Sequence, residues 1–406
     1  MSVPNITVLD SIMGSGKTSY IIDKMNADGG ANRFLYIAPL LSEVERIKDA
    51  CPSLDFQDPK PIGGRKLNHL QQLVADGQNI ASTHQLFLML DAQTRKQLDQ
   101  ANYILVIDEE TECVKEHQVS RDDIQTLLQA NCVYVDGQER LCWNDADWPA
   151  YRGQFDDIKT LCDNGSLVMV RNEFLVWEFP IEFLALFKEV HILTYLFEGS
   201  LLSSYLKANG VPYTQKTLDS SRRLVNPDPA HEAKTKSRLR KLINIIDDRK
   251  LNAVGTPRRQ ENPLSANWFR KDLRNGGAMT TQLKKNTYNY FRHRTKGQGT
   301  TKMWSCLKPY KHKLKGKGYT QGWTACNLKA TNDHIEKKHL AYLLNVFHRP
   351  RLVQYFHDCG VTTDQDKFAL SQLIQWIFRS GIRRGDSVDL YLPSARMREL
   401  LLDWLT

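Results

Sequence analysis

The chain has 406 residues, of which 41% are apolar and 25% are charged, as in an ordinary soluble globular protein. This length corresponds to two or three domains of about 100–200 residues. No stretch approaches the roughly 18 uninterrupted apolar residues of a transmembrane helix, and the first residues lack the pattern of a secretory signal. The eight cysteines form no CxxC pair, which excludes a zinc ribbon and a disulfide framework. We therefore expect a cytoplasmic protein with no membrane partner.

The positive charge of the chain is concentrated in residues 221–320. The whole chain has a formal net charge of +9, with 55 Lys and Arg against 46 Asp and Glu. Residues 221–320 alone hold 25 basic and 6 acidic side chains, so the rest of the chain is acidic. A dense cationic segment on an acidic protein is typical of binding to a polyanion, most often nucleic acid. A solvated basic loop is the alternative.

The first part of the chain alternates between short apolar runs and helical patterns. Strands are predicted at residues 6–10, 34–39, 79–83, 103–108 and 190–194, with a helix over 18–25. Ser42 and Glu45 form a capping-box pattern that predicts the start of another helix. Short β-like runs between 112 and 180 predict an insertion or an extension of the sheet. Such alternation is typical of βαβ units and a parallel sheet, which binds ligands at the C-terminal ends of its strands.

The segment from Ser11 to Thr18 reads SIMGSGKT and carries the strongest motif of the chain. It matches the phosphate-binding pattern GxxxxGK followed by Ser or Thr, except that Ser11 replaces the first glycine. Gly14, Ser15 and Gly16 would turn backbone N–H groups toward phosphate oxygens. Lys17 would reach the β- and γ-phosphates, and the hydroxyl of Thr18 would bind Mg²⁺. The motif therefore predicts ATP and Mg²⁺ as cofactors.

An acidic motif follows the apolar run at residues 103–107, at the end of a predicted strand. Asp108 is placed to hold Mg²⁺ through water, and Glu109 to polarise the attacking water as general base. An exposed acidic turn is the alternative interpretation. Together with the glycine-rich loop, the acidic motif predicts an NTP hydrolase, whatever process the hydrolysis drives.

A helix with two arginines is predicted at about residues 366–384. Its apolar face recurs at helical spacing in Leu370, Leu373, Ile374, Ile377 and Phe378. Gln375, Arg379 and Arg383 follow at intervals of four residues and would lie within an arc of roughly 80° if the helix continues. Two such arginines suit the charge of a γ-phosphate in the transition state, as arginine fingers. A structural salt bridge is the alternative.

Eight aromatic residues are distributed through residues 221–320, and Lys311–Lys317 is the densest basic run of this segment. Cations that track phosphates and aromatics that stack on bases are the chemistry of a single-strand channel. For any single aromatic residue we expect a place in the core. For Lys311, Lys313, Lys315 and Lys317 we expect contact with the DNA backbone.

The motifs of the chain resemble, in their order, those of superfamily 2 helicases. The segments 13–18, 36–40, 82–85, 106–110, 193–195 and 375–379 occur in the order of motifs I, Ia, Ib, II, III and VI. The stretch 193–199, LTYLFEG, looks like small helicases of tailed bacteriophages and the replication-origin-binding helicases of large DNA viruses. The last motif departs from the family pattern, because Phe378 replaces a glycine and one extra residue separates Arg379 from Arg383.

The resemblance implies two RecA-like parallel-sheet domains, with ATP bound between them and single-stranded or forked DNA across both. It places Pro39 and Thr83 near the DNA backbone and makes Thr194 the residue that couples the nucleotide site to the DNA site. It also places motif V at residues 324–333. The choice of DNA over RNA rests on this resemblance.

We therefore expect a first RecA-like domain over residues 1–205 and a second over 206–406, with 221–320 as a basic DNA-binding insertion. The expected function is an ATP-dependent DNA helicase or translocase of phage replication or recombination, with other replication proteins as partners. One alternative is a P-loop packaging or nucleotide-kinase ATPase. The other is a non-catalytic nucleic-acid-binding protein, although the complete set of Lys17, Thr18, Asp108 and Glu109 argues against it.

Overall fold

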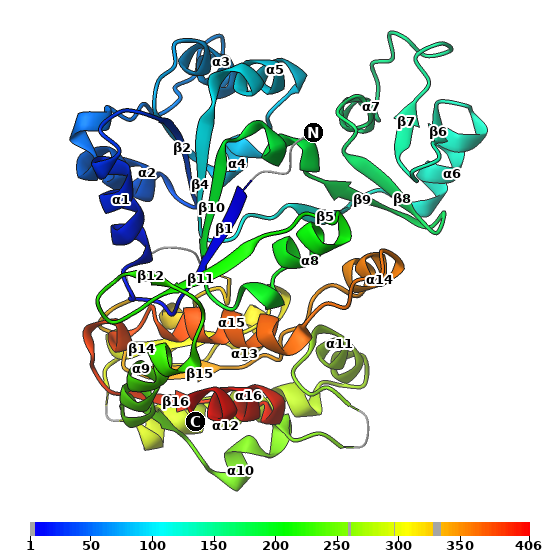
Figure 1. Ribbon diagram of the computed structural model, residues 1–406. Coiled ribbons are helices and arrows are strands. Elements are labelled where there is room, and N and C mark those ends of the chain that lie inside the picture. Colours follow the sequence, from blue (N-terminus) through cyan, green and yellow to red (C-terminus); the bar gives the residue numbers. More distant parts are fainter. Residues whose placement is uncertain (1–4, 259–260, 296, 328–333) are drawn as a thin grey trace. The chain divides into compact units, whose positions relative to one another are not determined.

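The computed structural model describes residues 5–258, 261–295, 297–327 and 334–406 (Figure 1). The chain divides into two compact units. The first holds the chain up to Ser11, Gly16–Lys216 and His348–Thr363, and the second holds Ile12–Ser15, Thr217–Phe347 and Asp364–Thr406. The units therefore interleave along the sequence, unlike the expected pair of domains that meet between residues 205 and 206.

A seven-stranded sheet with the order β12-β11-β1-β10-β4-β2-β3 forms the centre of the first unit and continues past its boundary at Lys216. Its strands are β1 (Asn5–Asp10), β2 (Arg33–Ala38), β3 (Ile80–Thr83), β4 (Tyr103–Asp108), β10 (Glu189–Thr194), β11 (Thr214–Leu218) and β12 (Leu224–Val225). All neighbours pair in parallel except β11 and β12. The expected parallel α/β sheet is thus confirmed.

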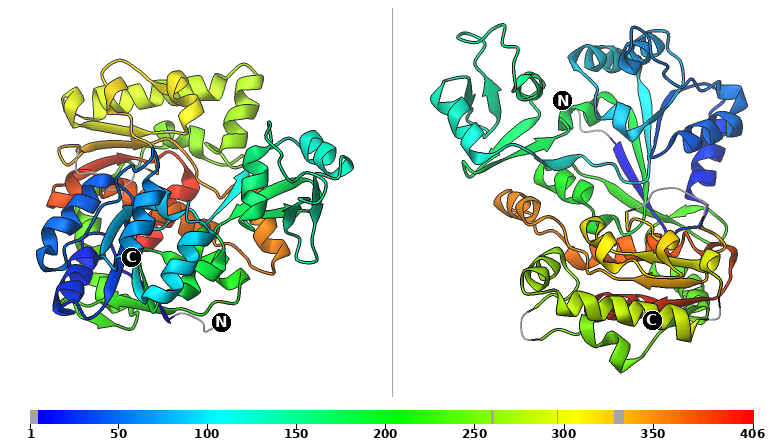
Figure 2. Two further views of the ribbon diagram at one scale, coloured as in Figure 1. Left: turned by 90° about the horizontal axis from the view of Figure 1, so that it is seen from above. Right: turned by 180° about the vertical axis from the view of Figure 1, so that it is seen from behind.

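Helices flank this sheet on both faces (Figures 1 and 2). They are α1 (Lys17–Ala27), α2 (Leu41–Ala50), α3 (Lys66–Ala75), α4 (His84–Phe87), α5 (Ala92–Ala101) and α8 (Leu201–Ala208). Every residue of β4 is buried, as expected for a parallel strand covered on both faces. The capping-box prediction was wrong, because α2 begins at Leu41 after an extended Leu40, so that Ser42 lies inside the first turn.

A smaller antiparallel region is inserted between β4 and β10. Its three-stranded sheet has the order β5-β9-β8 and a two-stranded ribbon joins β6 to β7. The elements are β5 (Val114–His117), α6 (Arg121–Gln129), β6 (Val133–Val135), β7 (Leu141–Trp143), α7 (Asp156–Asp163), β8 (Leu167–Val170) and β9 (Phe174–Glu178). The expected insertion is therefore a pair of separate small sheets.

Helix α14 (Pro350–Asp358) is distant in sequence but belongs to the first unit, where it binds the small antiparallel sheet. The Arg171 guanidinium donates two hydrogen bonds to the Asp358 carboxylate, at 2.8 and 2.7 Å. The hydroxyl of Tyr355 donates to the carboxylate of Glu178. These contacts explain why residues 348–363 leave the second unit.

The second unit has a four-stranded parallel sheet with the order β13-β16-β15-β14. Its strands are β13 (Ile243–Ile245), β14 (Lys302–Ser305), β15 (His339–Tyr342) and β16 (Val388–Tyr391). Its helices are α9 (Pro229–Leu242), α10 (Arg249–Asn252), α11 (Ala266–Arg274), α12 (Ala278–Asn289), α13 (Lys311–Leu314), α15 (Gln365–Ile377) and α16 (Ala395–Leu405). The prediction that 221–320 is an insertion was wrong, because this segment supplies β13 and β14 to the sheet itself.

The aromatic residues of the basic segment mainly build the core of the second unit. Phe269, Tyr290, Phe291, Trp304 and Tyr319 are each at most 2% exposed. The expectation that single aromatics belong to the core is confirmed for these five residues. They hold the helices of the basic segment against its sheet and cannot stack on a bound base.

The expected helix over 366–384 ends early, at Ile377. Its predicted apolar face is buried throughout, from Leu370 to Phe378. Ser380 and Gly381 then interrupt the helix, and the hydroxyl of Ser380 accepts the N–H of Ile382 to begin a separate 3₁₀ turn. The prediction of a continuous arginine-bearing helix was therefore wrong. Within the described residues, none of the helices combines the length and apolar character needed to cross a membrane.

Candidate nucleotide site and nucleic-acid interface

The loop between β1 and α1 has the backbone conformation that its glycines predict. Gly14 has φ +79° and Gly16 has φ +93°, in the left-handed region that favours glycine. A Cβ at Gly14 would meet no atom within 4 Å, so the backbone conformation and not packing requires glycine there. The N–H of buried Ser11 donates to the carbonyl of Thr194 at 3.1 Å, which extends the strand pairing into the loop. Serine at this position therefore fits the loop.

Lys17 and Thr18 form the first turn of α1, directly after this loop. The ammonium of Lys17 donates to the carbonyl of Ser11 and so spans the loop from end to start. The first turn contains no acidic residue, and Gly16 provides no side-chain cap. The N–H groups at the start of a helix and the helix dipole make such an N-terminus suitable for an anion.

Asp108 is the last residue of β4 and is only 8% exposed. Its Oδ2 accepts hydrogen bonds from the hydroxyl of Tyr36 at 2.5 Å and from the hydroxyl of Thr18 at 3.4 Å. The pKa of Asp108 is raised above its ordinary value, because the effect of burial exceeds that of the hydrogen bond from Tyr36, which lowers it. The structure thus brings together Thr18 and Asp108, which the sequence proposed as metal ligands, and adds Tyr36, which the sequence analysis missed.

Glu109 is half-buried and lies at a sharp turn after β4. Its φ is +59°, an uncommon value for a residue other than glycine, and its N–H donates to the carbonyl of Leu193 at 3.0 Å. A nitrogen of the His84 ring lies 2.9 Å from the carbonyl oxygen of Asp108, on the other side of the same turn. The peptide group between Asp108 and Glu109 is therefore held at its N–H by Leu193 and at its carbonyl by His84.

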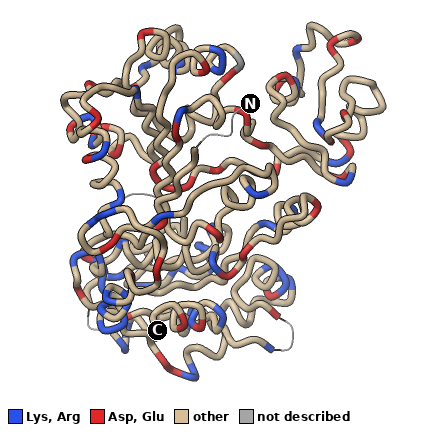
Figure 3. Tube along the Cα trace, in the orientation of Figure 1, with Lys and Arg blue, Asp and Glu red and all other residues tan. Residues whose placement is uncertain are grey.

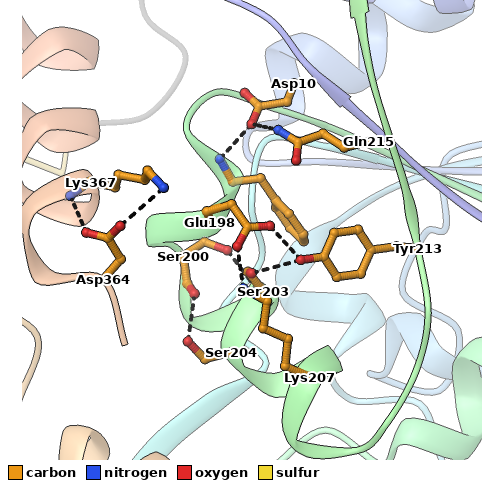
Figure 4. Close-up of polar contacts among 11 residues, drawn as sticks. Asp10, Glu198, Ser200, Ser203, Ser204, Lys207, Tyr213, Gln215, Asp364 and Lys367 are labelled. Atoms are coloured by element: carbon orange, nitrogen blue, oxygen red, sulfur yellow. Dashed lines mark hydrogen bonds and ion pairs between the residues drawn. The ribbon is translucent and has the colours of Figure 1, made fainter. Parts of the chain in front are cut away.

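Asp10 is a second residue that the sequence analysis missed. It ends β1, and its carboxylate accepts the N–H of Leu196 at 2.8 Å and the N–H of Phe197 at 3.0 Å. The same carboxylate accepts the side-chain amide of Gln215 at 2.8 Å (Figure 4). Leu196 has φ +57°, so this turn is held in an uncommon conformation. Buried Thr194, the expected coupling residue, pairs with Asp10 across the sheet. Asp10 comes directly before the glycine-rich loop, and this position is the signal that could have identified it from the sequence.

Pro39 and Thr83 follow or end neighbouring strands. Ala38 at the end of β2 pairs with Thr83 at the end of β3, and Pro39 comes next in the chain. Both Pro39 and Thr83 are half-buried. Since parallel strands end at a common edge, both residues lie on the edge of the sheet that also carries Asp10 and Asp108.

Gln375, Arg379 and Arg383 all lie in the second unit, whereas Lys17, Thr18, Asp108 and Glu109 lie in the first. The side chain of Gln375 donates to the hydroxyl of Ser371 at 3.0 Å, within α15. Arg379 follows the helix and is only 6% exposed, but Arg383 is exposed on the separate 3₁₀ turn Gly381–Arg384. The expected common helical face of the two arginines therefore does not form.

The predicted DNA-binding lysines lie on and after the short helix α13. Lys313, Lys315 and Lys317 are exposed, and the ammonium of half-buried Lys311 lies 4.0 Å from the ring centre of Trp323. Of the expected motif V, residues 328–333 lie outside the described part of the chain. The hydroxyl of Thr324, at its start, accepts the indole N–H of Trp376 at 2.7 Å.

The donor set at Thr18 and Asp108 consists of a hydroxyl and a carboxylate, which are oxygen ligands that Mg²⁺ prefers. Among the described residues, no group of three or more His, Cys, Asp and Glu side chains could hold a metal ion. Mg²⁺ characteristically keeps several waters and takes other ligands from substrate phosphates. The residues present therefore fit Mg²⁺ that arrives with a nucleotide, and do not fit a metal held by the protein alone.

These features define a mixed α/β protein with a glycine-rich loop at the edge of a large parallel sheet and a second, smaller parallel sheet. Residues 237–405 match the model of the YonV C-terminal Rossmann-like domain, and residues 114–177 match that of the YonV middle domain. The chain is 37% identical, over 412 residues and 98% of both chains, to the SPbeta prophage-derived uncharacterized protein YonV of Bacillus subtilis (strain 168). The chain belongs to the YonV family.

Two solved structures are similar over most of the chain. The structure of S. tokodaii Xpd4 is 11% identical with a TM-score of 0.40, over 98% of this chain and 94% of that one. A hypothetical ATP-dependent RNA helicase from Sulfolobus tokodaii is also 11% identical, with a TM-score of 0.27, over 99% of this chain and 91% of that one. The family matches agree with the fold, since the middle domain corresponds to the small antiparallel sheets and the Rossmann-like domain includes β13 and β14.

Proposed function

We propose that this protein is an ATP-dependent DNA helicase or translocase that separates strands or remodels branches in phage DNA replication or recombination. The observation that carries this proposal is the meeting of Thr18 and Asp108 beside a glycine-rich loop at the edge of a parallel sheet. The order of the helicase-like motifs and the basic charge of residues 221–320 support nucleic acid as the second ligand. The prophage origin in the name of the Bacillus relative supports the phage setting.

In the proposed site, the loop N–H groups and the N-terminus of α1 bind the phosphates of the nucleotide. Lys17 would exchange the Ser11 carbonyl for phosphate oxygens, and Thr18 and Asp108 would hold Mg²⁺. When bound, Mg²⁺ neutralises charge on the phosphate oxygens. The hydrogen bond to the Ser11 carbonyl therefore holds Lys17 at the loop, and a phosphate oxygen can replace that carbonyl.

Glu109 is the proposed general base, which orients the attacking water and accepts its proton. The backbone hydrogen bond from Glu109 to Leu193 fixes the turn that carries this carboxylate. Arg379, the buried arginine, is the proposed finger, and Gln375 and Arg383 are accessory residues of the same motif.

Coupling is proposed to run through Thr194. Its carbonyl accepts the N–H of Ser11 at the start of the phosphate loop, and the turn that follows it is held by Asp10. Changes in the loop can therefore reach the edge of the sheet where Pro39 and Thr83 lie. These two residues, with Lys311, Lys313, Lys315 and Lys317, are the proposed contacts to the DNA backbone.

A strand-displacement assay tests this proposal. The wild-type chain is incubated with ATP, Mg²⁺ and a forked duplex that has one fluorescent strand, and release of that strand is followed in time. We expect release that depends on ATP, abolition by Lys17→Ala, and no change with Lys96→Ala, an exposed lysine on α5. ATP hydrolysis without strand release on forks or branched DNA would leave a packaging or nucleotide-kinase ATPase as the better proposal. Binding of DNA without any hydrolysis would favour the non-catalytic protein.

A further inference from the structure

Burial separates one aromatic residue of the basic segment from the other seven. Five are core residues, and Trp268 and Tyr310 are half-buried. Tyr288 is 40% exposed, although it comes two residues before fully buried Tyr290. It lies near the C-terminal end of α12, and its ring is therefore accessible to a ligand from solvent.

Three cationic side chains surround Tyr288 on the helix surface. Lys284 precedes it by one turn, Lys285 by three residues, and Arg292 follows four residues later; all three are exposed. At about 100° per residue, Tyr288 lies between Lys284 and Lys285 on the circumference of α12. We call Lys284, Lys285, Tyr288 and Arg292 the α12 patch.

The α12 patch has no acidic counterpart on its own helix. The sequence of α12, AMTTQLKKNTYN, contains no Asp or Glu. Asp272 of neighbouring α11 caps the other end of α12, where it accepts the N–H groups of Met279 and Thr280. Within the described residues, no ion pair includes any of the three cations of the patch. Their charge is therefore available to an external anion. Figure 3 shows Lys and Arg gathered along the chain of the second unit.

The helix geometry changes two residues after Tyr288, at Tyr290. Residues Tyr290–Arg294 form a π-helix, a rare conformation that is frequent at functional sites. Tyr290 and Phe291 of this turn point into the core, whereas Arg292 is exposed and Arg294 pairs with Asp248 at 2.6 Å. The wide turn thus keeps two aromatic rings inside and presents Arg292 on the outer side.

We propose that the α12 patch is a binding site for single-stranded nucleic acid, in which Tyr288 stacks on one base and the three cations bind the flanking phosphates. The proposal rests on the proposed function and adds a contact separate from Lys311–Lys317. An exposed ring with cations on both sides matches the alternating base and phosphate of a single strand. The bases of an intact duplex are already stacked on one another and offer no free face, so the patch selects unpaired nucleotides.

Equilibrium binding to fluorescent oligonucleotides tests the patch. Fluorescence anisotropy gives Kd for oligothymidylate, for an abasic oligonucleotide of the same length, for oligouridylate and for a blunt duplex. We expect Tyr288→Ala to weaken binding to oligothymidylate by at least about 5-fold, Tyr288→Phe to restore it, and the abasic strand and the duplex to bind both variants equally. Oligouridylate distinguishes RNA from DNA as the strand. Thermal unfolding verifies that each variant is folded.

The salt dependence of Kd tests the cations. Single strands lose about 0.7 in the slope of log K against log salt for each phosphate contact removed. The triple variant Lys284→Gln/Lys285→Gln/Arg292→Gln should therefore make that negative slope shallower by about 2. The matched control Arg65→Gln/Lys96→Gln/Arg152→Gln removes three exposed cations of the first unit and should leave the slope close to wild type.

Each of the following results would overturn the proposal. If Tyr288→Ala binds oligothymidylate as tightly as wild type, or if both triple variants change the slope equally, the patch is a solvated helix surface. If the wild-type chain releases strands from a fork while the patch variants bind normally, the patch fails and the proposed function stands. If the wild-type chain binds neither single strands nor forks, both fail together.

Discussion

The hydroxyl of Tyr36 donates a 2.5 Å hydrogen bond to Oδ2 of Asp108, the same oxygen that accepts the hydroxyl of Thr18. Tyr36 is fully buried in β2, next to the strand that ends at Asp108. The contact fixes the orientation of a carboxylate that the proposed mechanism uses to hold Mg²⁺. Tyr36 is therefore a positioning residue that acts through Asp108.

Tyr36→Phe should weaken the dependence of nucleotide binding on Mg²⁺ while the fold persists. Without the hydroxyl, Asp108 is no longer held in one orientation, and a buried hydrogen bond to a charged group contributes about 1.5–3 kcal/mol. We expect a roughly 10- to 150-fold rise in the Mg²⁺ concentration that gives half-maximal binding of a fluorescent ATP analogue. Tyr103→Phe, which removes another buried hydroxyl of the same sheet, is the control. An unchanged Mg²⁺ requirement in Tyr36→Phe would show that the contact is structural only.

Asp10→Asn should separate turnover from nucleotide affinity. Its carboxylate holds the amides of Leu196 and Phe197, and an asparagine can accept only one of them without turning its own NH₂ toward the other. We expect a loss of about 1–3 kcal/mol in the free energy of unfolding and a fall in nucleic-acid-stimulated kcat with little change in KM for ATP. Gln215→Ala, which removes only the third contact, should change both much less. Equal loss of kcat and ATP affinity would argue against a role in coupling.

Arg379 and Arg383 should differ in their effect on turnover, because one is buried and the other is exposed. If Arg379 is the finger, Arg379→Ala should lower kcat by about 10³- to 10⁵-fold, and Arg383→Ala should lower it much less. Arg384→Ala is the control, since Arg384 is exposed beside them and pairs with Asp386. Measured kcat, KM and Tm decide the matter. A lowered Tm with nearly normal kcat in Arg379→Ala would make Arg379 a structural residue.

The contribution of Glu178 to the free energy of unfolding should fall as pH rises. Burial raises the pKa of Glu178 above its ordinary value of 4.5, while the hydroxyl of Tyr355 lowers it. The folded state therefore binds a proton more tightly than the unfolded state, and this contribution to stability is lost as pH rises from 4.5 through the raised pKa. Urea denaturation of wild type and Glu178→Gln over this range measures it. The advantage of Glu178→Gln over wild type should grow with pH, and a constant difference would contradict the prediction.

The edge of the large sheet could be predicted from the sequence because buried parallel strands are continuous apolar runs. β4 reads YILVID, and the acidic motif begins at its last residue. The glycine-rich loop likewise comes directly after β1 in the chain. The strands of the second unit could not be recognised in the same way. β13 has only three residues, and β14 contains Lys302, whose ammonium lies over the ring of Phe291 in an otherwise aromatic core. A buried lysine made a strand of the core look like part of a basic surface.

The site residues that escaped prediction depend on contacts distant in sequence. Asp10 binds amides that are 186 and 187 residues away, and Tyr36 binds a carboxylate 72 residues away. The end of α15 escaped for a local reason. The apolar spacing continues to Phe378, but the Ser380–Gly381 pair begins a new turn and breaks the helical phase that placed Arg383 beside Arg379.

We propose that the glycine-rich loop and the acidic motif hydrolyse ATP in response to nucleic acid. Steady-state ATP hydrolysis, measured with and without single-stranded DNA for wild type, Lys17→Ala and Glu109→Gln, tests it most directly. We expect hydrolysis that single-stranded DNA stimulates, no turnover in Lys17→Ala, and a Glu109→Gln variant that binds ATP but hydrolyses it about 10²- to 10⁴-fold more slowly. Turnover by Lys17→Ala at the wild-type rate, or wild-type turnover that no nucleic acid changes, would contradict it.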